Sequence, residues 1–185
     1  MRVFYALSLP QLMENFCLSI IDSLKSKREF SDVRWSHPDL LHITLRFHAN
    51  IDEAQLNQIN TLLDEQLIHY KTISLSTRRL LLLPHKKPHL IAVAINLNEG
   101  LAGLVRLINE ATLAAGIPLE KRPYLGHITL GRFNESTVHN QIILTDIKTI
   151  ADTANHVVLY QSEPTDKGSV YTPLKHFELD SATNK

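Results

Sequence analysis

Apolar residues recur along this chain in two patterns, one typical of strands and one typical of helices. Val3 to Leu9 form an apolar run that ends at Pro10, as a buried strand does. Apolar residues then recur at helical spacing, which predicts an amphipathic helix with Leu12, Met13, Phe16, Cys17, Ile20, Ile21 and Leu24 as candidate core positions. A short extended segment at 33–35 and a strand at 41–47 follow.

The rest of the chain carries more strand patterns than helix patterns. Asp52 suits the N-cap of a helix from about residue 53 to 69, and Gly116 is placed to end another that includes Leu101 to Thr112. Strand patterns cover 73–75, 80–83, 90–97, 127–133, 157–161, 170–171 and 176–179. The strands cluster between helices and do not alternate with them regularly. The sequence therefore predicts an α+β architecture and not a doubly wound parallel sheet.

Composition narrows the class of protein. The 185 residues are 44% hydrophobic, enough for one core, and carry 19 acidic and 19 basic residues. Such a balance argues against a protein that coats nucleic acid, but it leaves room for a local basic pocket. Cys17 is the one cysteine, which excludes an intramolecular disulfide and a thiolate metal cluster. No apolar run reaches the length of a membrane span or a signal-peptide core, so we expect a cytoplasmic protein.

A repeated tetrapeptide carries the candidate chemistry. His-Ile-Thr-Leu occurs at residues 42–45 and again at 127–130. Each copy lies in a predicted strand, follows a proline-marked loop, and is soon followed by an Arg-Phe pair. This arrangement indicates an internal duplication in which each half supplies one copy.

The spacing within the repeat sets which side chains share a surface. Residues two apart on a strand point to the same face, so each copy presents an imidazole and a hydroxyl together: His42 with Thr44, and His127 with Thr129. Across a cleft, one imidazole could take a proton while the other gives one. The hydroxyls could donate hydrogen bonds to phosphate oxygens. Such a set suits phosphoryl chemistry without a metal or other cofactor.

The two arginines that follow the repeats differ in spacing. Arg46 comes four residues after His42, on the same strand face, whereas Arg132 comes five residues after His127, on the opposite face of a regular strand. Glycine in a strand often marks a β-bulge, so a bulge at Gly131 is expected to turn Arg132 into the cleft. Arg46 is open to two interpretations, a phosphate ligand or an exposed charge near the rim.

The chain resembles the two-histidine phosphoesterases, and most closely the RNA 2′,3′-cyclic phosphodiesterases, also called 2′-5′ RNA ligases. Similar segments are residues 2–7, 33–35, 40–47, 122–124, 127–130 and 170–174. The resemblance implies one bilobal domain over residues 1–185, with two antiparallel sheets lining a central cleft and helices outside. It also implies hydrolysis of a 2′,3′-cyclic phosphate to a 2′-phosphomonoester.

Residue roles follow from the same resemblance. His42 would give a proton to the leaving oxygen and His127 would act as the base for water, while Thr44 and Thr129 hold the phosphate. Arg132 and Tyr171 would line the pocket, although Tyr171 could also be a core aromatic residue. The expected partner is an RNA or nucleotide with a cyclic phosphate end, bound by a monomer with no obligate protein partner. Two alternatives stay open: an RNA ligase or phosphodiesterase acting on another 2′-5′-linked or cyclic nucleotide, and a non-catalytic module that binds RNA ends.

Overall fold

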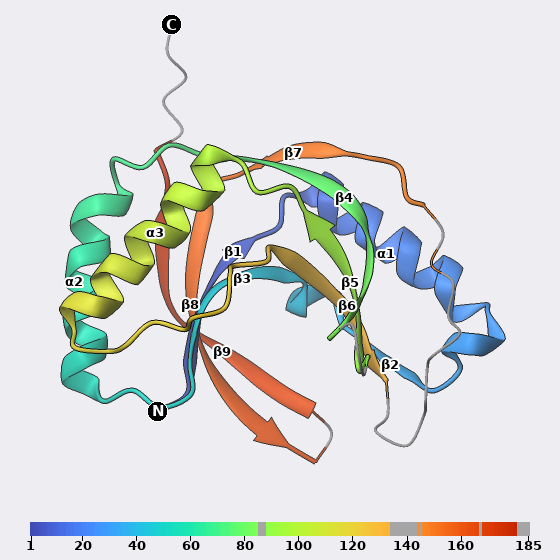
Figure 1. The fold of residues 1–185 in the computed structure, drawn as a ribbon, viewed down its shortest axis with the longest axis horizontal. Coiled ribbons are helices and arrows are strands. Elements are labelled where there is room, and N and C mark those ends of the chain that lie inside the picture. The colour runs from blue at the N-terminus through green and yellow to red at the C-terminus, as the bar shows by residue number, and fades with distance from the viewer. Residues whose placement is uncertain (85–87, 134–143, 145, 167, 181–185) are drawn as a thin grey trace, which may run out of the picture.

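One large sheet carries the predicted site residues on its strands (Figure 1). The computed structural model describes residues 1–84, 88–133, 144, 146–166 and 168–180. Within these residues nine strands form one sheet in the order β7-β4-β5-β6-β3-β1-β8-β9, with β2 paired to β6. The strands are β1 (Val3–Ser8), β2 (Val33–Trp35), β3 (His42–His48), β4 (Ile73–Leu83), β5 (Leu90–Ile95), β6 (His127–Phe133), β7 (Ala151–Ala154), β8 (His156–Thr165) and β9 (Gly168–Glu178). Neighbouring strands are antiparallel, and the predicted α+β class is confirmed.

The two copies of the repeat meet at the middle of the sheet. β3 and β6 pair through Ile43 and Ile128, and this contact joins the two expected sheets into one. A step of one residue along each antiparallel strand sets His42 opposite Thr129 and Thr44 opposite His127. Both isoleucines are fully buried, so the histidines and threonines lie together on the other face.

Three α-helices in the described residues cover the sheet: α1 (Gln11–Lys25), α2 (Glu53–Leu67) and α3 (Glu99–Ala114). As predicted, Asp52 caps α2, accepting a hydrogen bond from the Gln55 backbone N–H in a capping box. Gly116 ends α3 with a φ of 76°, which suits glycine. Figure 1 shows α2 and α3 side by side and α1 apart from them. One predicted core position of α1 is wrong, because Leu12 is 55% exposed.

The β8–β9 hairpin is longer than the sequence patterns predict. β9 runs without interruption from Gly168 to Glu178 and includes Pro173, where the patterns suggested a break. Proline is tolerated there because β9 is an edge strand, and the register between β8 and β9 shifts beside Pro173. The hairpin carries Ser169 and Tyr171 towards the His/Thr face of the sheet. Across the described residues, no helix has the length and apolar character needed to cross a membrane.

Candidate active site

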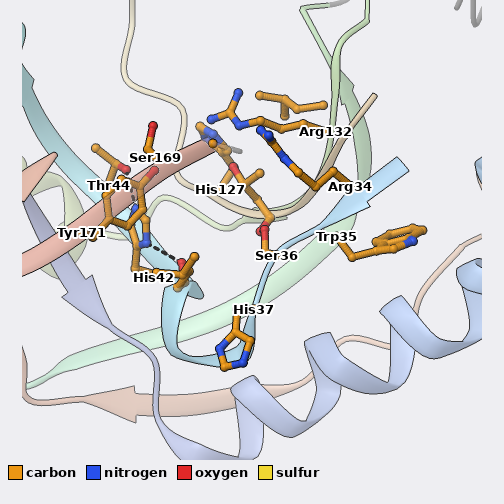
Figure 2. Close-up of a pocket in the computed structure, with 14 residues that line it drawn as sticks. Arg34, Trp35, Ser36, His37, His42, Thr44, His127, Arg132, Ser169 and Tyr171 are labelled. Carbon is orange, nitrogen blue, oxygen red and sulfur yellow. Dashed lines mark hydrogen bonds between the residues drawn. The ribbon is translucent and has the colours of Figure 1, made fainter. Parts of the chain in front are cut away.

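A cavity of about 290 Å³ lies on the face that the two repeats share. Six of the predicted site residues line it: His42, Thr44, His127, Thr129, Arg132 and Tyr171. It is also lined by residues that were not predicted: Arg34, Trp35, Ser36, His37, Leu40, Leu90, Gly168 and Ser169. The cavity therefore draws on both halves of the chain and on the β8–β9 hairpin (Figure 2).

Each histidine is held by the backbone two residues before it. Nδ1 of His42 lies 2.7 Å from the carbonyl oxygen of Leu40, and Nδ1 of His127 lies 2.8 Å from that of Leu125. A carbonyl oxygen can only accept, so Nδ1 carries the proton in both rings. Each ring then has Nε2 left for proton transfer.

The threonine of the first copy interacts directly with its histidine. Nε2 of His42 lies 3.1 Å from Oγ1 of Thr44, as the dashed line in Figure 2 marks. The hydroxyl of Tyr124 donates a 3.0 Å hydrogen bond to the Thr44 carbonyl, although Tyr124 precedes the second repeat. This bond links the backbone of one copy to the loop that leads into the other.

Aromatic rings surround His42. Phe4 stacks on it at a centroid distance of 4.9 Å, and Tyr171 meets it edge-on at 5.7 Å. Tyr160 stacks on Phe4 at 5.2 Å, and its ring centroid lies 6.3 Å from that of His42. Burial in these surroundings lowers the pKa of His42 to about 4, opposed by the Leu40 carbonyl and reinforced by His127 and Arg132. His42 is therefore neutral at pH 7 before the charge of a bound anion is added.

The expected bulge before Arg132 is present. Ile91 pairs with Gly131 while the next residue of β5, Ala92, pairs with Thr129, so β6 has one extra residue there. The bulge turns Arg132 to the face of His127 and Thr129. Gly131 is required for close packing of β2, because an added Cβ would lie 2.6 Å from Cγ1 of Val33.

Arg46 does not line this cavity. Its side chain lines a neighbouring groove of about 540 Å³, and its Nη2 donates a 3.2 Å hydrogen bond to the Pro118 carbonyl. The groove adjoins the cavity through Thr44, Leu90 and His127, which line both. The structure thus separates the two arginines that follow the repeats.

Similarity to known proteins agrees with this geometry. A sequence model of LigT-like phosphoesterases matches residues 18–93. A Methanothermobacter thermautotrophicus protein named RNA 2′,3′-cyclic phosphodiesterase is 25% identical over 184 residues, covering 96% of this chain and 98% of its own length. A Bacillus subtilis protein of the same name is 29% identical over 132 residues, covering 71% of this chain and 72% of its own. The chain is therefore similar in sequence to the LigT-like phosphoesterases.

Solved structures show that the LigT-like fold extends over nearly the whole chain. The TT0787 protein of Thermus thermophilus superposes with a TM-score of 0.83 at 23% identity, covering 99% of this chain and all of that one. Escherichia coli LigT complexed with 3′-AMP superposes with a TM-score of 0.74 at 21% identity, covering 96% and 97%. These likenesses establish a shared fold.

Sequence reasoning missed several residues of this site. Phe4 and Tyr160 looked like ordinary strand residues, and nothing in their local patterns links them to His42. Arg34 had a signal, because residues 33–35 are part of the family resemblance, yet its place beside Arg132 depends on how β2 pairs. The described residues contain no group of three or more His, Cys, Asp or Glu side chains arranged to hold a metal ion.

Proposed function

We propose that this protein hydrolyses the 2′,3′-cyclic phosphate of an RNA or nucleotide to a 2′-phosphomonoester, using His42 and His127 as an acid/base pair without a metal. One observation carries the proposal: the two His-x-Thr motifs, 85 positions apart in the chain, line a single cavity with both Nδ1 atoms already occupied. A binding module would not need two imidazoles held in this way. The names of the relatives support the same substrate class.

The reaction follows from the placement of the rings. Water attacks phosphorus while Nε2 of His127 takes its proton, and the bond from phosphorus to the 3′ oxygen breaks as Nε2 of His42 protonates that oxygen. The phosphate stays on the 2′ oxygen. Thr44, Thr129 and Arg132 would hold the non-bridging oxygens, since hydroxyl and guanidinium donors stabilise the negative charge that develops there.

His42 can donate a proton only if its ring is protonated when the substrate is bound. Burial and the charge of Arg132 lower the pKa of His42 to about 4, which favours the neutral ring at pH 7. A phosphate anion placed against Nε2 stabilises the imidazolium and raises that pKa. The negative charge of the substrate would thus favour protonation of His42, which then protonates the leaving 3′ oxygen.

We infer that the enzyme works in the cytoplasm as a single domain and a monomer, with RNA or nucleotide ends as its partner. The buried thiol of Cys17, whose pKa burial raises to about 12, suits a reducing compartment.

An assay with a nucleoside 2′,3′-cyclic phosphate in excess EDTA tests the proposal. We expect turnover to the 2′-phosphate, identified by ³¹P NMR, and its loss in His42→Ala and in His127→Ala. His69→Ala is the matched control, because His69 is exposed and lines neither cavity. Loss of activity on chelation, a 3′-phosphate product, or activity retained in both active-site variants would contradict the proposal. Tight binding of the 2′-phosphate without turnover between pH 5 and 9 would favour a binding module. Faster cleavage of 2′-5′-linked oligonucleotides than of the cyclic phosphate would favour a phosphodiesterase that acts on 2′-5′ linkages.

A further inference from the structure

The neighbouring groove of about 540 Å³ is continuous with the cavity that holds both histidines. Within the described strands, β3 and β6 pair at a single position, Ile43 with Ile128. The groove lies next to this pair, between the rest of β3 and the segment that leads into β6. Thr44, Leu90 and His127 line both spaces. A molecule held between the two histidines can therefore extend into the groove.

The cavity and the groove differ in chemistry. Most residues that line the cavity carry hydrogen-bonding or charged side chains. More than half of those that line the groove are apolar or aromatic, among them Phe47, Leu83, Val105, Tyr124 and Leu125. A nucleotide has the same two parts, a phosphate with its sugar and a flat base with apolar faces. The cavity, at about 290 Å³, is at the lower end of the size of small-ligand sites, so a base needs the additional space.

The covalent structure of ribose places the base on the side of the groove. Cleavage of the bond to the 3′ oxygen puts that oxygen against His42 and the attacking water against His127. The base is attached to C1′, which is bonded to C2′ and not to C3′, so it lies beside the 2′ oxygen and away from His42. The groove fits this arrangement, because His127 and Thr44 line it and His42 does not.

Tyr124 provides a fixed aromatic surface in the groove. Its hydroxyl donates a 3.0 Å hydrogen bond to the Thr44 carbonyl, which holds the ring beside the first His-x-Thr motif. The side chain is half-buried and lines the groove. Bases stack on such rings, because every base has a π face. Tyr124 therefore suits a base that extends from the cavity.

Asn109 of α3 carries the hydrogen-bonding groups that a base edge requires. Its Oδ1 atom is shielded from water and has no hydrogen-bond partner among the described residues. Buried polar atoms are nearly always paired, so this one indicates a partner supplied by water or by a ligand. Rotation about χ2 lets the amide turn either end towards the groove. An amide has a donor and an acceptor side by side, and adenine presents the complementary pair on one edge.

We infer that the groove is the subsite for the base of the nucleotide that carries the cyclic phosphate, with Tyr124 as the stacking surface and Asn109 as the residue that selects adenine. The inference rests on the proposed function, because it places the phosphorus atom between the two histidines. Asn109 is then a specificity-determining residue and touches none of the reacting atoms.

Five substrates test this subsite. They are the four nucleoside 2′,3′-cyclic phosphates and a methyl riboside 2′,3′-cyclic phosphate, which keeps the reacting group and lacks the base. For the wild type we expect kcat/KM on the adenosine substrate to be at least about tenfold higher than on the riboside, since stacking one base contributes at this level. We expect it to be at least about fivefold higher than on the uridine substrate, since a paired amide discriminates between bases to this extent.

Two substitutions at one position separate the stacking space from the hydrogen bonds. Asn109→Leu should lower kcat/KM on the adenosine substrate to near the uridine value, because the paired hydrogen bonds are lost. Asn109→Trp should lower all four nucleosides towards the riboside, because the indole fills the groove. Both variants should turn over the riboside as the wild type does, which also shows that they are folded. Asn57→Leu and Asn57→Trp are the matched controls, because Asn57 is exposed on α2 and lines neither space.

Three outcomes would overturn the inference. Equal rates of the wild type on the nucleosides and the riboside would exclude a base subsite. Unchanged ratios in Asn109→Trp, or an equal loss on the nucleosides and the riboside, would exclude the groove as its place. Equal rates of the wild type on all four nucleosides would exclude selection by Asn109. In each case turnover of the riboside by the wild type would leave the proposed function standing, whereas no turnover of any cyclic phosphate would refute that function.

Discussion

The two copies of the His-x-Thr motif have the same backbone arrangement and different surroundings. In both, Nδ1 donates to the carbonyl two residues earlier, so the tautomer is the same. His42 is packed among Phe4 and Tyr171 and contacts the hydroxyl of Thr44, and its pKa falls to about 4. His127 lies beside Arg132, as Figure 2 shows.

The difference indicates how a duplicated motif can divide one reaction into two roles. Local hydrogen bonds set the orientation of the rings, and these are duplicated with the tetrapeptide. Protonation depends on tertiary packing, and this packing is not duplicated. The aromatic residues that bury His42 come from β1, β8 and β9, which have no equivalent around His127 in the described residues. The asymmetry therefore arises outside the motif.

The largest effect is expected from removing either ring. His42→Ala and His127→Ala should each lower kcat/KM by roughly 10²–10⁴-fold, the range of general acid–base catalysis. Because the two groups act on one phosphorus, the double variant should lose little more than the worse single variant. Steady-state kinetics on a nucleoside cyclic phosphate provides the measurement. Losses that multiply in the double variant would mean that the rings work independently.

Substituting the arginines that follow the repeats should lower kcat/KM less than removing a histidine, and by different amounts for the two arginines. Arg132→Gln should lower kcat/KM by about 10–100-fold, because it removes a charge-assisted contact to phosphate. Arg46→Gln, the matched substitution in the first copy, should change it by less than about threefold, since this half-buried arginine lines the neighbouring groove and not the cavity. The same kinetic assay on the mononucleotide compares them. A larger loss of kcat/KM in Arg46→Gln than in Arg132→Gln would indicate that the phosphate binds in the neighbouring groove.

The bulge in the second copy predicts an effect on stability. Gly131→Ala puts a Cβ 2.6 Å from Val33 and 3.0 Å from the Trp35 ring, so it should lower the free energy of unfolding by about 1–3 kcal/mol. Gly126→Ala is the control, because its nearest neighbours would lie 3.5 Å away, an ordinary contact. Urea unfolding of the three proteins measures the difference. Equal stability of the two variants would show that β2 does not need the glycine.

The smallest effect is a shift in titration. In the free protein the His42 ring should titrate near pH 4, well below the ordinary pKa of histidine, because burial disfavours the imidazolium. Added 2′-phosphate product should raise this pKa, since its negative charge stabilises the protonated ring. NMR of the ring protons over a pH series follows both states. A His42 ring that titrates above pH 6 in the free protein, or whose pKa the product leaves unchanged, would contradict this prediction.

Acid sensitivity follows from the same shift. A histidine whose native pKa is lowered binds fewer protons when folded than when unfolded, so its contribution to stability is lost as pH falls from about 6.5 towards 4. His48 behaves as His42 does, with its pKa lowered to about 4 by burial and by Arg46. His48→Gln should therefore flatten the fall in unfolding free energy over this range.

Much of the site could be predicted from the sequence, because its determinants are local. Spacing alone placed each histidine on the same face as its threonine, and the position of Gly131 predicted the bulge that redirects Arg132. The rest depends on contacts between distant segments. Arg34 joins the site because β2 pairs with β6, and Phe4 buries His42 because β1 pairs with β3. The sequence patterns did not predict an uninterrupted β9, because they suggest a break at Pro173. The proline is tolerated there because β9 lies at the edge of the sheet, which local patterns do not reveal.

A crystal structure with the 2′-phosphate product tests the central claim most directly. We predict one phosphorus atom between the rings, with its oxygens at hydrogen-bond distance, roughly 2.6–3.2 Å, from Nε2 of both His42 and His127. A phosphate that contacts only one of these rings, or that binds in the groove beside Arg46, would contradict it.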